Sequence, residues 1–179
     1  MDEIETKILE VDPKSISEKL DSLGAELILD TKFAVDWFRT KDSQEGDDQW
    51  FLRIRTTAQG KSEVTWKGFS TVLGDSRRHK EISFEIAEPK KMGDLFLNIG
   101  LEKYAHQDKL RKSWQLKDWR FDLDTYPNMP SYLEIEGKSE AHIQEAIQSL
   151  ALVNHKKSSG GERILIQEKY GLDWYNMHF

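Results

Sequence analysis

Charged side chains recur at every second position along most of this 179-residue chain. The first example is Glu3-Ile4-Glu5-Thr6-Lys7. On a β-strand its charged residues share one face and its uncharged residues the other, because successive side chains alternate across a strand. The same alternation, with apolar residues between the charges, continues at Arg53/Arg55, Lys67, Glu81/Glu85, Lys109/Arg111, Asp122/Asp124 and Glu134/Glu136. The pattern predicts a sheet with one apolar face and one face that carries cations and carboxylates in pairs.

The like-charged pairs on this face indicate a ligand. Like charges placed close together repel, so several basic and several acidic pairs on one face do not favour folding by themselves. A bound polyanion together with a divalent cation would satisfy both sets. The alternative that the pattern leaves open is an antiparallel sheet whose charged face meets water.

The rest of the sequence predicts helices and turns between the strands. Asp12-Pro13 is a typical helix start and Gly24 a typical helix end, which predicts a helix over about residues 13–23. Similar signals predict helices at 89–99, from Ser139 to about Leu150, and at 162–170. Strands are predicted at 25–40 (as one strand or two), 50–57, 62–67, 81–86, 104–116, 119–126 and 131–137, with loops at 41–49 and 68–78.

About eight strands carry the charged face, and antiparallel sheets of this size tend to curl or close. We therefore expect an α+β fold, in which a closed or nearly closed antiparallel β-barrel of about eight strands has its helices packed outside. The charged face would then line a tunnel. The length of the chain fits a single domain over residues 1–179.

Composition excludes several kinds of site. The chain has no Cys, which removes disulfides, thiolate metal sites and cysteine nucleophiles. Its five His show no helical His-x-x-x-His spacing, so no zinc site is predicted. A formal charge of -6 disfavours nucleic acid as a partner. No apolar stretch reaches the length of a membrane span and no secretory signal is present, so we expect no membrane association and a cytoplasmic protein.

The order of the charged segments resembles that of the CYTH superfamily, the triphosphate tunnel metalloenzymes, which include class IV adenylyl cyclases, thiamine triphosphatases and inorganic tripolyphosphatases. The Glu-x-Glu-x-Lys strand is the hallmark of this family. The later segments follow in the order of the family's strands, over most of the chain. These segments are Phe51-Leu52-Arg53-Ile54-Arg55, Val64-Thr65-Trp66-Lys67-Gly68, Lys80-Glu81-Ile82-Ser83-Phe84-Glu85, Lys109-Leu110-Arg111, Phe121-Asp122-Leu123-Asp124 and Tyr132-Leu133-Glu134-Ile135-Glu136.

The resemblance implies that a divalent metal, Mg²⁺ or Mn²⁺, binds the acidic residues and that the basic residues grip a triphosphate. The implied metal ligands are Glu3, Glu5, Asp122, Glu134 and Glu136. The implied substrate-binding residues are Lys7, Arg53, Arg55, Lys67, Lys109 and Arg111, with Lys67 and Glu81 as candidate catalytic residues. The residue chemistry agrees, because Mg²⁺ and Mn²⁺ prefer carboxylate oxygens and Arg matches phosphate oxygens in a bidentate manner.

The chain departs from the family pattern on one strand. Ser83 interrupts the alternating glutamates that family members carry there, and the family's Arg ahead of Glu81 corresponds to one of Arg78, His79 and Lys80. The implied activity is metal-dependent hydrolysis of a small-molecule triphosphate. Two alternatives stay open: conversion of ATP to cyclic AMP and pyrophosphate, and non-catalytic binding of polyphosphate or nucleotide. An exposed apolar edge would allow a homodimer, although the sequence does not locate one.

Overall fold

The computed structural model describes residues 2–43 and 50–179, and strands account for a much larger part of them than helices do. The elements in chain order are β1 (Asp2–Ile8), α1 (Pro13–Ser22), β2 (Glu26–Thr40), β3 (Phe51–Thr57), β4 (Ser62–Lys67), β5 (Thr71–Leu73), β6 (Ser76–Ile86), α2 (Pro89–Asn98), β7 (Leu101–Leu116), β8 (Trp119–Thr125), β9 (Tyr132–Glu136), α3 (Glu140–Ser149), β10 (Lys157–Ser158), α4 (Glu162–Ile164), the π-helix η1 (Leu165–Lys169) and β11 (Asn176–Met177).

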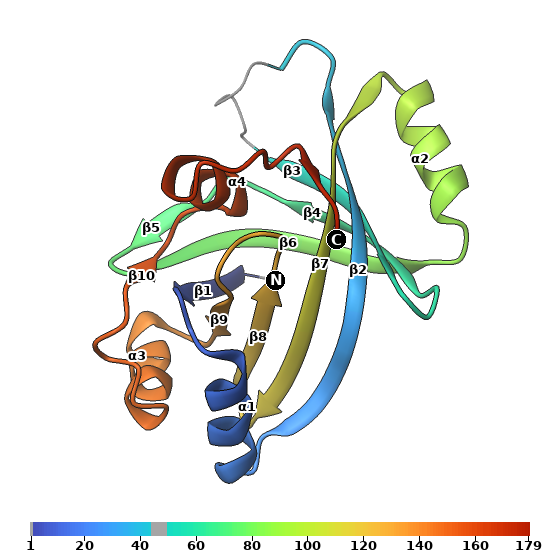
Figure 1. The fold of residues 1–179 in the computed structure, drawn as a ribbon. Helices are drawn as coiled ribbons and strands as arrows, with labels where there is room; N and C mark the ends of the chain where they lie inside the picture. Colours follow the sequence, from blue (N-terminus) through green and yellow to red (C-terminus); the bar gives the residue numbers. More distant parts are fainter. Residues whose placement is uncertain (1, 44–49) are drawn as a thin grey trace.

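The sheet closes on itself into an antiparallel barrel (Figure 1). Within the described residues its strand order is β1-β9-β8-β7-β2-β3-β4-β6, and β6 pairs again with β1. In this closing pair Glu3 lies opposite His79 and Glu5 opposite Arg77. The predicted α+β fold with a closed barrel of eight strands is therefore confirmed. The short strands β5, β10 and β11 pair outside this ring.

Most predicted elements are present, with two differences in the strands. The segment at 25–40 forms one long strand, β2, whose pairing with β7 shifts register at Ile28 and between Trp37 and Phe38. The loop predicted at 68–78 is wrong in part, because Thr71–Leu73 and Ser76–Arg78 form a hairpin around Gly74. In the loop predicted at 41–49, residues 44–49 lie outside the described part of the chain.

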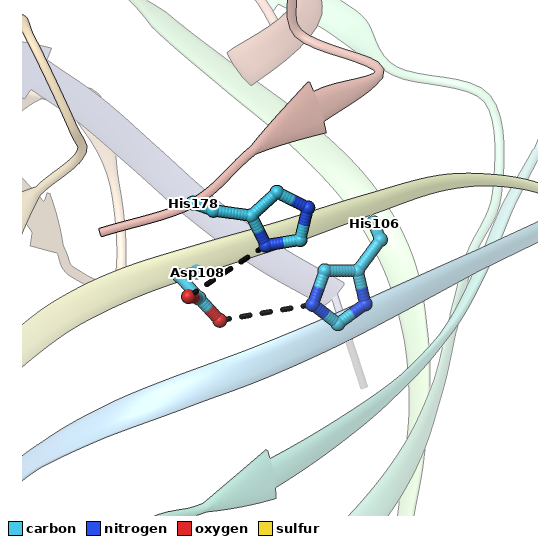
Figure 2. A group of neighbouring side chains, drawn as sticks. All are labelled: His106, Asp108 and His178. Atoms are coloured by element: carbon cyan, nitrogen blue, oxygen red, sulfur yellow. Dashed lines mark ion pairs between the residues drawn. The ribbon is translucent and has the colours of Figure 1, made fainter.

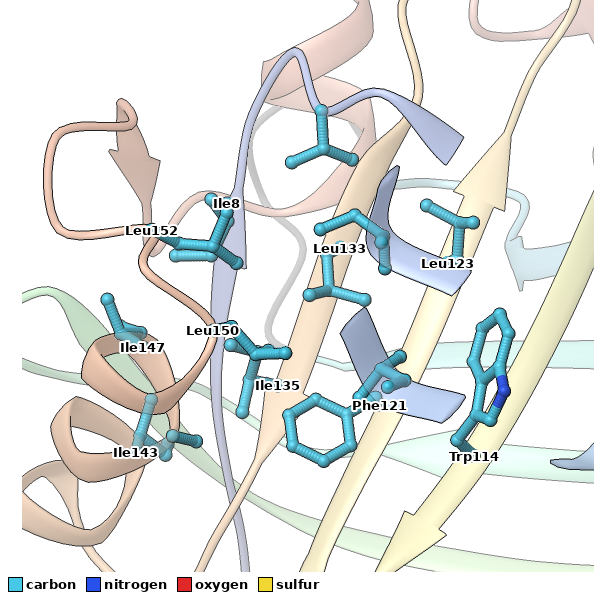
Figure 3. Packing of buried hydrophobic residues seen from close by; sticks show 14 residues of the cluster. Ile8, Trp114, Phe121, Leu123, Leu133, Ile135, Ile143, Ile147, Leu150 and Leu152 are labelled. Carbon is cyan, nitrogen blue, oxygen red and sulfur yellow. The ribbon is translucent and has the colours of Figure 1, made fainter. Parts of the chain in front are cut away.

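One apolar core lies between the outer face of the barrel and the helices α1 and α3 (Figure 3). Ile8, Leu133 and Ile135 point outward from β1 and β9, and each is fully buried. Ile143 and Ile147 of α3 pack against them. The helix begins at Ser139, whose side chain accepts a hydrogen bond from the amide of His142, as expected of an N-cap.

A second outer core lies under α2, where Phe96 packs with Phe38, Ile54 and Val64 from β2, β3 and β4. Helices therefore cover the apolar outer face on two sides of the barrel, as predicted for α1, α2 and α3 (Figure 1). Across residues 2–43 and 50–179, no helix has the length and apolar character needed to cross a membrane.

The C-terminal segment does not follow the prediction that the helices pack outside. Phe33, Val35 and Trp37 point from β2 into the lumen, on the same side as Arg53 and Arg55. Residues of η1 and of the chain beyond it cover this inward apolar surface, and they include Leu165, Ile166 and Trp174. One side of the barrel interior is thus filled by apolar side chains, and the charged residues surround the remaining space.

Truncation of the outer core should destabilise the barrel strongly. Ile135 is 0% exposed, and Ile135→Ala should lower the free energy of unfolding by about 2–5 kcal/mol. The matched control is Ile82→Ala on β6, where the side chain is 48% exposed and a change within about 0.5 kcal/mol is expected. Urea unfolding monitored by Trp fluorescence measures both. Equal losses in the two variants would contradict the assignment of the core.

Candidate functional site

A cavity of about 530 Å³ occupies the lumen beside the C-terminal segment. Most of the predicted site residues line it, because the strand register turns their side chains inward. These lining residues are Glu3, Arg53, Arg55, Lys67, Glu81, Arg111, Asp122, Glu134 and Glu136. Glu5, Lys7 and Lys109 do not line the cavity but are buried in the ionic network around it.

The predicted metal ligands form two groups of oxygen donors. Asp122 on β8 lies directly opposite Glu134 on β9, and Glu136 lies two residues further along the same inward face. One ligand atom from each of these three residues lies within 4.8 Å of the others. Glu3 and Glu5 form a similar group with His79 across the β1–β6 pair. The closed barrel thus brings together carboxylates that are far apart in the sequence.

Glu136 lies farther from a cation than the other two members of the first group do. Burial, reinforced by repulsion from Glu3, Asp122 and Glu134, raises the pKa of Glu136 to about 10. The nearest opposing cation is Arg120, whose Nε lies 4.0 Å from Oε1 of Glu136. Such a carboxylate holds a proton at neutral pH unless another cation replaces it. A divalent metal at this position would supply that cation.

Glu5 and Lys7 belong to a fully buried ionic network. The Lys7 ammonium lies 3.0 Å from Oε1 of Glu5 and 2.7 Å from Oε2 of Glu134. Burial would raise the pKa of Glu5, but Arg77, Lys7 and Lys67 outweigh this effect and hold the pKa well below its ordinary value. Oε2 of Glu5 is buried without a hydrogen-bond partner among the described residues. This oxygen is available to a metal ion.

Lys67 is held as a cation by the carboxylates around it. Its Nζ lies 2.7 Å from Oε2 of Glu3 and 2.9 Å from Oε2 of Glu81. Burial lowers the pKa of Lys67, but attraction to Glu5 and Glu3 outweighs burial, and the net pKa is raised. A lysine with a raised pKa is suited to bind phosphate and unsuited to accept a proton. This environment argues against Lys67 as the group that activates a nucleophile.

Arg53 and Arg55 project side by side from β3 into the cavity. The Arg53 guanidinium lies 5.4 Å from the ring centre of Trp37, and its Nε has no hydrogen-bond partner in the described chain. Arg55 pairs with Glu63 on β4, directly opposite it. Burial and the neighbouring Arg53 lower the pKa of Arg55. Two adjacent guanidinium groups in a buried wall form a binding surface for an anion.

Arg111 and Lys109 on β7 are engaged by carboxylates. The Arg111 guanidinium binds both Asp122 and Asp124, with Nε 2.6 Å from Oδ1 of Asp124. The Lys109 ammonium lies 3.0 Å from Asp124 and 2.9 Å from Glu162 of α4. The sequence interpretation did not assign a role to Asp124 or Glu162. Asp124 could have been found from its place in the alternating pattern, whereas Glu162 lies outside any strand.

The register of β6 places Arg77 and His79 inside the barrel and leaves Arg78 and Lys80 exposed. Of the three positions that the sequence left open, only His79 lines the cavity, and the inward arginine is Arg77, which pairs with Glu5. Charges stand on both faces of this strand, so the alternation did not determine which ones point inward.

The donor atoms fit a hard divalent cation. The two acidic groups offer carboxylate oxygens with a single imidazole, and carboxylates are the ligands that Mg²⁺ and Mn²⁺ prefer. A bound cation would replace the proton of Glu136 and would pair with Oε2 of Glu5, which has no hydrogen-bond partner in the described chain and lies 3.7 Å from the Lys67 ammonium. The residues at which the sequence predicted metal binding are thus suited to the metals that it predicted.

The comparisons with known proteins identify the family. The family model of the CYTH domain matches residues 1–163, and this chain belongs to the CYTH family. No curated protein matches the chain at a significant level.

Solved structures share the fold at low sequence identity. The PH1819 protein of Pyrococcus horikoshii OT3 has a TM-score of 0.74 and 22% identity, covering 93% of this chain and 99% of that one. A Hippeastrum protein, described as a candidate adenylyl cyclase with a dominant triphosphatase activity, has a TM-score of 0.69 and 16% identity over 93% and 96% of the two chains. A candidate adenylate cyclase of Vibrio parahaemolyticus has a TM-score of 0.65 and 13% identity, with 99% and 92% covered.

The raised pKa of Glu136 predicts how stability depends on pH. The folded carboxyl keeps its proton up to about pH 10, whereas the ordinary pKa of a glutamate is 4.5, so its contribution to stability is lost as the pH rises between these values. Without metal, the wild type should lose at least about 1.4 kcal/mol relative to Glu136→Gln between pH 6 and pH 9, the equivalent of one pKa unit.

Urea unfolding in the presence of a chelator measures this difference. Glu85→Gln, which changes an exposed carboxylate on β6, serves as the control and should follow the wild type. Addition of Mg²⁺ should stabilise the wild type at pH 9 more than Glu136→Gln. If wild type and Glu136→Gln share the same pH dependence, the acidic group does not carry the repulsion described above.

Proposed function

We propose that this protein is a divalent-metal-dependent phosphohydrolase that acts on a triphosphate bound in the barrel lumen. The observation that carries the proposal is the juxtaposition of three carboxylates, those of Asp122, Glu134 and Glu136, with Arg53 and Arg55 around one cavity. Within this acidic group, burial and repulsion keep Glu136 protonated unless a cation binds there. A polyanion would pair with the two arginines, and the metal ion that it carries would pair with the carboxylates. Membership of the CYTH family supports this substrate class.

The residues of the chain take complementary roles in this proposal. Arg53 and Arg55 bind the phosphate chain, and the cationic Lys67 neutralises charge that develops during transfer. Glu81 lines the cavity beside Lys67 and accepts the proton of the attacking water. Arg111 and Lys7 hold the carboxylates in position. When bound by the glutamates and Asp122, Mg²⁺ or Mn²⁺ supplies charge neutralisation and orientation of the phosphoryl group.

Cyclization of ATP is the second candidate function. Phe69 and Val72 line the same cavity and are 75% and 65% exposed. Exposed apolar side chains beside a phosphate site provide a surface for a base, which an inorganic polyphosphate does not need. A non-catalytic polyphosphate binder is the alternative of another class. The buried carboxylates weigh against it, because they weaken the binding of an anion when no metal is present.

The reaction products distinguish these functions. Purified protein is incubated with tripolyphosphate or ATP and Mg²⁺ or Mn²⁺, and orthophosphate, pyrophosphate and cyclic AMP are resolved by chromatography. The expected result is orthophosphate with a phosphate chain shortened by one unit, with less turnover in Ca²⁺ because that ion favours looser coordination. Cyclic AMP with pyrophosphate would establish the cyclase instead. Binding without any product would support the non-catalytic alternative.

Loss of one phosphate-binding cation should reduce turnover strongly. Arg55→Ala should lower kcat/KM for tripolyphosphate by at least about 100-fold, comparable to removal of one donor from an oxyanion site. The matched control is Arg78→Ala, because Arg78 is exposed on the outer face of β6. Its activity should equal that of the wild type. Similar losses in both variants, or none in Arg55→Ala, would contradict binding in the lumen.

A further inference from the structure

A cluster of two histidines and an aspartate lies outside the barrel, away from the proposed active site. His106 and Asp108 point outward from β7, and His178 follows the short strand β11 (Figure 2). Nε2 of His106 lies 3.7 Å from Oδ1 of Asp108, and Nδ1 of His178 lies 3.8 Å from Oδ2. The two imidazole rings are nearly parallel, with 4.9 Å between their centres. Three potential ligand atoms therefore converge on one point.

The hydrogen bonds on the far side of each ring determine which nitrogen faces this point. Nδ1 of His106 lies 2.6 Å from the Asp36 carboxylate, and Nε2 of His178 lies 2.8 Å from the side-chain oxygen of Asn176. Both partners are acceptors, so in the neutral imidazoles these nitrogens carry the protons. The opposite nitrogens then direct lone pairs toward Asp108. Both distances to that carboxylate exceed hydrogen-bond length.

We propose that His106, Asp108 and His178 form a binding site for a divalent transition-metal ion such as Zn²⁺. Imidazole nitrogens and one carboxylate oxygen are a common ligand set for this ion, and Mg²⁺ does not favour imidazole. Metal-binding histidines usually donate their other nitrogen to a carboxylate or carbonyl, as both do here. Lys32 lies 2.9 Å from Oδ2 of Asp108, which leaves Oδ1 as the ligand oxygen.

The site joins two segments that are distant in the sequence. β11 pairs with β7 in parallel at His106 and Gln107, beyond the end of the β7–β8 pairing at Leu110. Gln107 in turn donates a hydrogen bond to the carbonyl of Trp174, which lines the lumen cavity. Residues 176–177 form few backbone contacts of their own, since the strand is only two residues long. A bound metal would fasten the C-terminal segment to the barrel.

Zinc titration of the full chain tests the site. Isothermal titration calorimetry is carried out with Zn²⁺ in excess Mg²⁺, so that the hard cation occupies the oxygen-rich lumen. The wild type should bind one Zn²⁺ that His178→Ala and Asp108→Asn lose. Asp36→Asn removes an outer hydrogen-bond partner and should weaken this binding by about 10- to 100-fold.

Two controls separate this site from the others. His155→Ala removes a histidine from a different part of the structure and should bind Zn²⁺ as the wild type does. Glu134→Gln alters the lumen and should also leave the external site unchanged. Far-UV circular dichroism establishes that each variant is folded. Zinc binding that is the same in wild type, folded His178→Ala and folded Asp108→Asn would overturn the proposal.

Hydrogen exchange tests whether the metal fastens the C-terminal segment. In the wild type, Zn²⁺ should slow deuterium uptake in peptides that cover residues 172–179, and in His178→Ala it should have no effect there. Uptake in the wild type that is unchanged at saturating Zn²⁺ would overturn the fastening role.

Discussion

Burial of opposite charges inside a closed barrel is the constraint on which the rest of this structure depends. Lys109 and Asp124 are 0% exposed, and Lys7 is 1% exposed. A charge buried without a partner costs several kcal/mol, so the register of the strands must bring each one to an opposite charge. Lys7 lies opposite Glu134 and Arg111 opposite Asp124. A slip by one residue would turn these charges outward into the apolar cores, so the same residues that line the lumen also specify the pairing.

This network is only partly balanced by the protein. Among the acidic residues, Glu136 stays protonated at neutral pH unless a metal binds. Among the basic residues, Arg55 forms an ion pair with Glu63, and Lys109 forms one with Glu162. A polyanion can replace these carboxylates with a similar number of charge-assisted hydrogen bonds, so exchange costs little. A metal at Glu136 removes the remaining repulsion. The buried carboxylates are thus costly for folding. They favour binding of a polyanion together with a metal ion, because the polyanion pairs with the basic residues and the metal with the acidic ones, as in the proposed hydrolase.

The sequence predicted those parts of the fold that depend on alternation. The closed barrel and the inward position of Arg53 and Arg55 follow from charges that alternate with buried apolar residues. On β6, Arg77 and His79 point inward and Arg78 and Lys80 outward, so both faces are charged and only the pairing with β1 decides between them. Contacts between distant segments are not encoded in local patterns at all. Glu162 at Lys109, and His178 beside His106, depend on the path of the C-terminal segment in three dimensions.

The C-terminal segment lies mostly beyond the residues that match the CYTH family model, and it packs inside the barrel. The match to the CYTH family model ends at residue 163, yet Leu165, Ile166 and Trp174 fill the apolar side of the lumen that β2 leaves open. A barrel interior has to be packed, so the path of this segment sets how much space remains for a ligand. Trp174 lines the cavity, and the hydrogen bond from Gln107 ties its backbone to β7 one residue away from His106. Whatever holds the segment at β7 consequently helps to shape the cavity from outside the barrel.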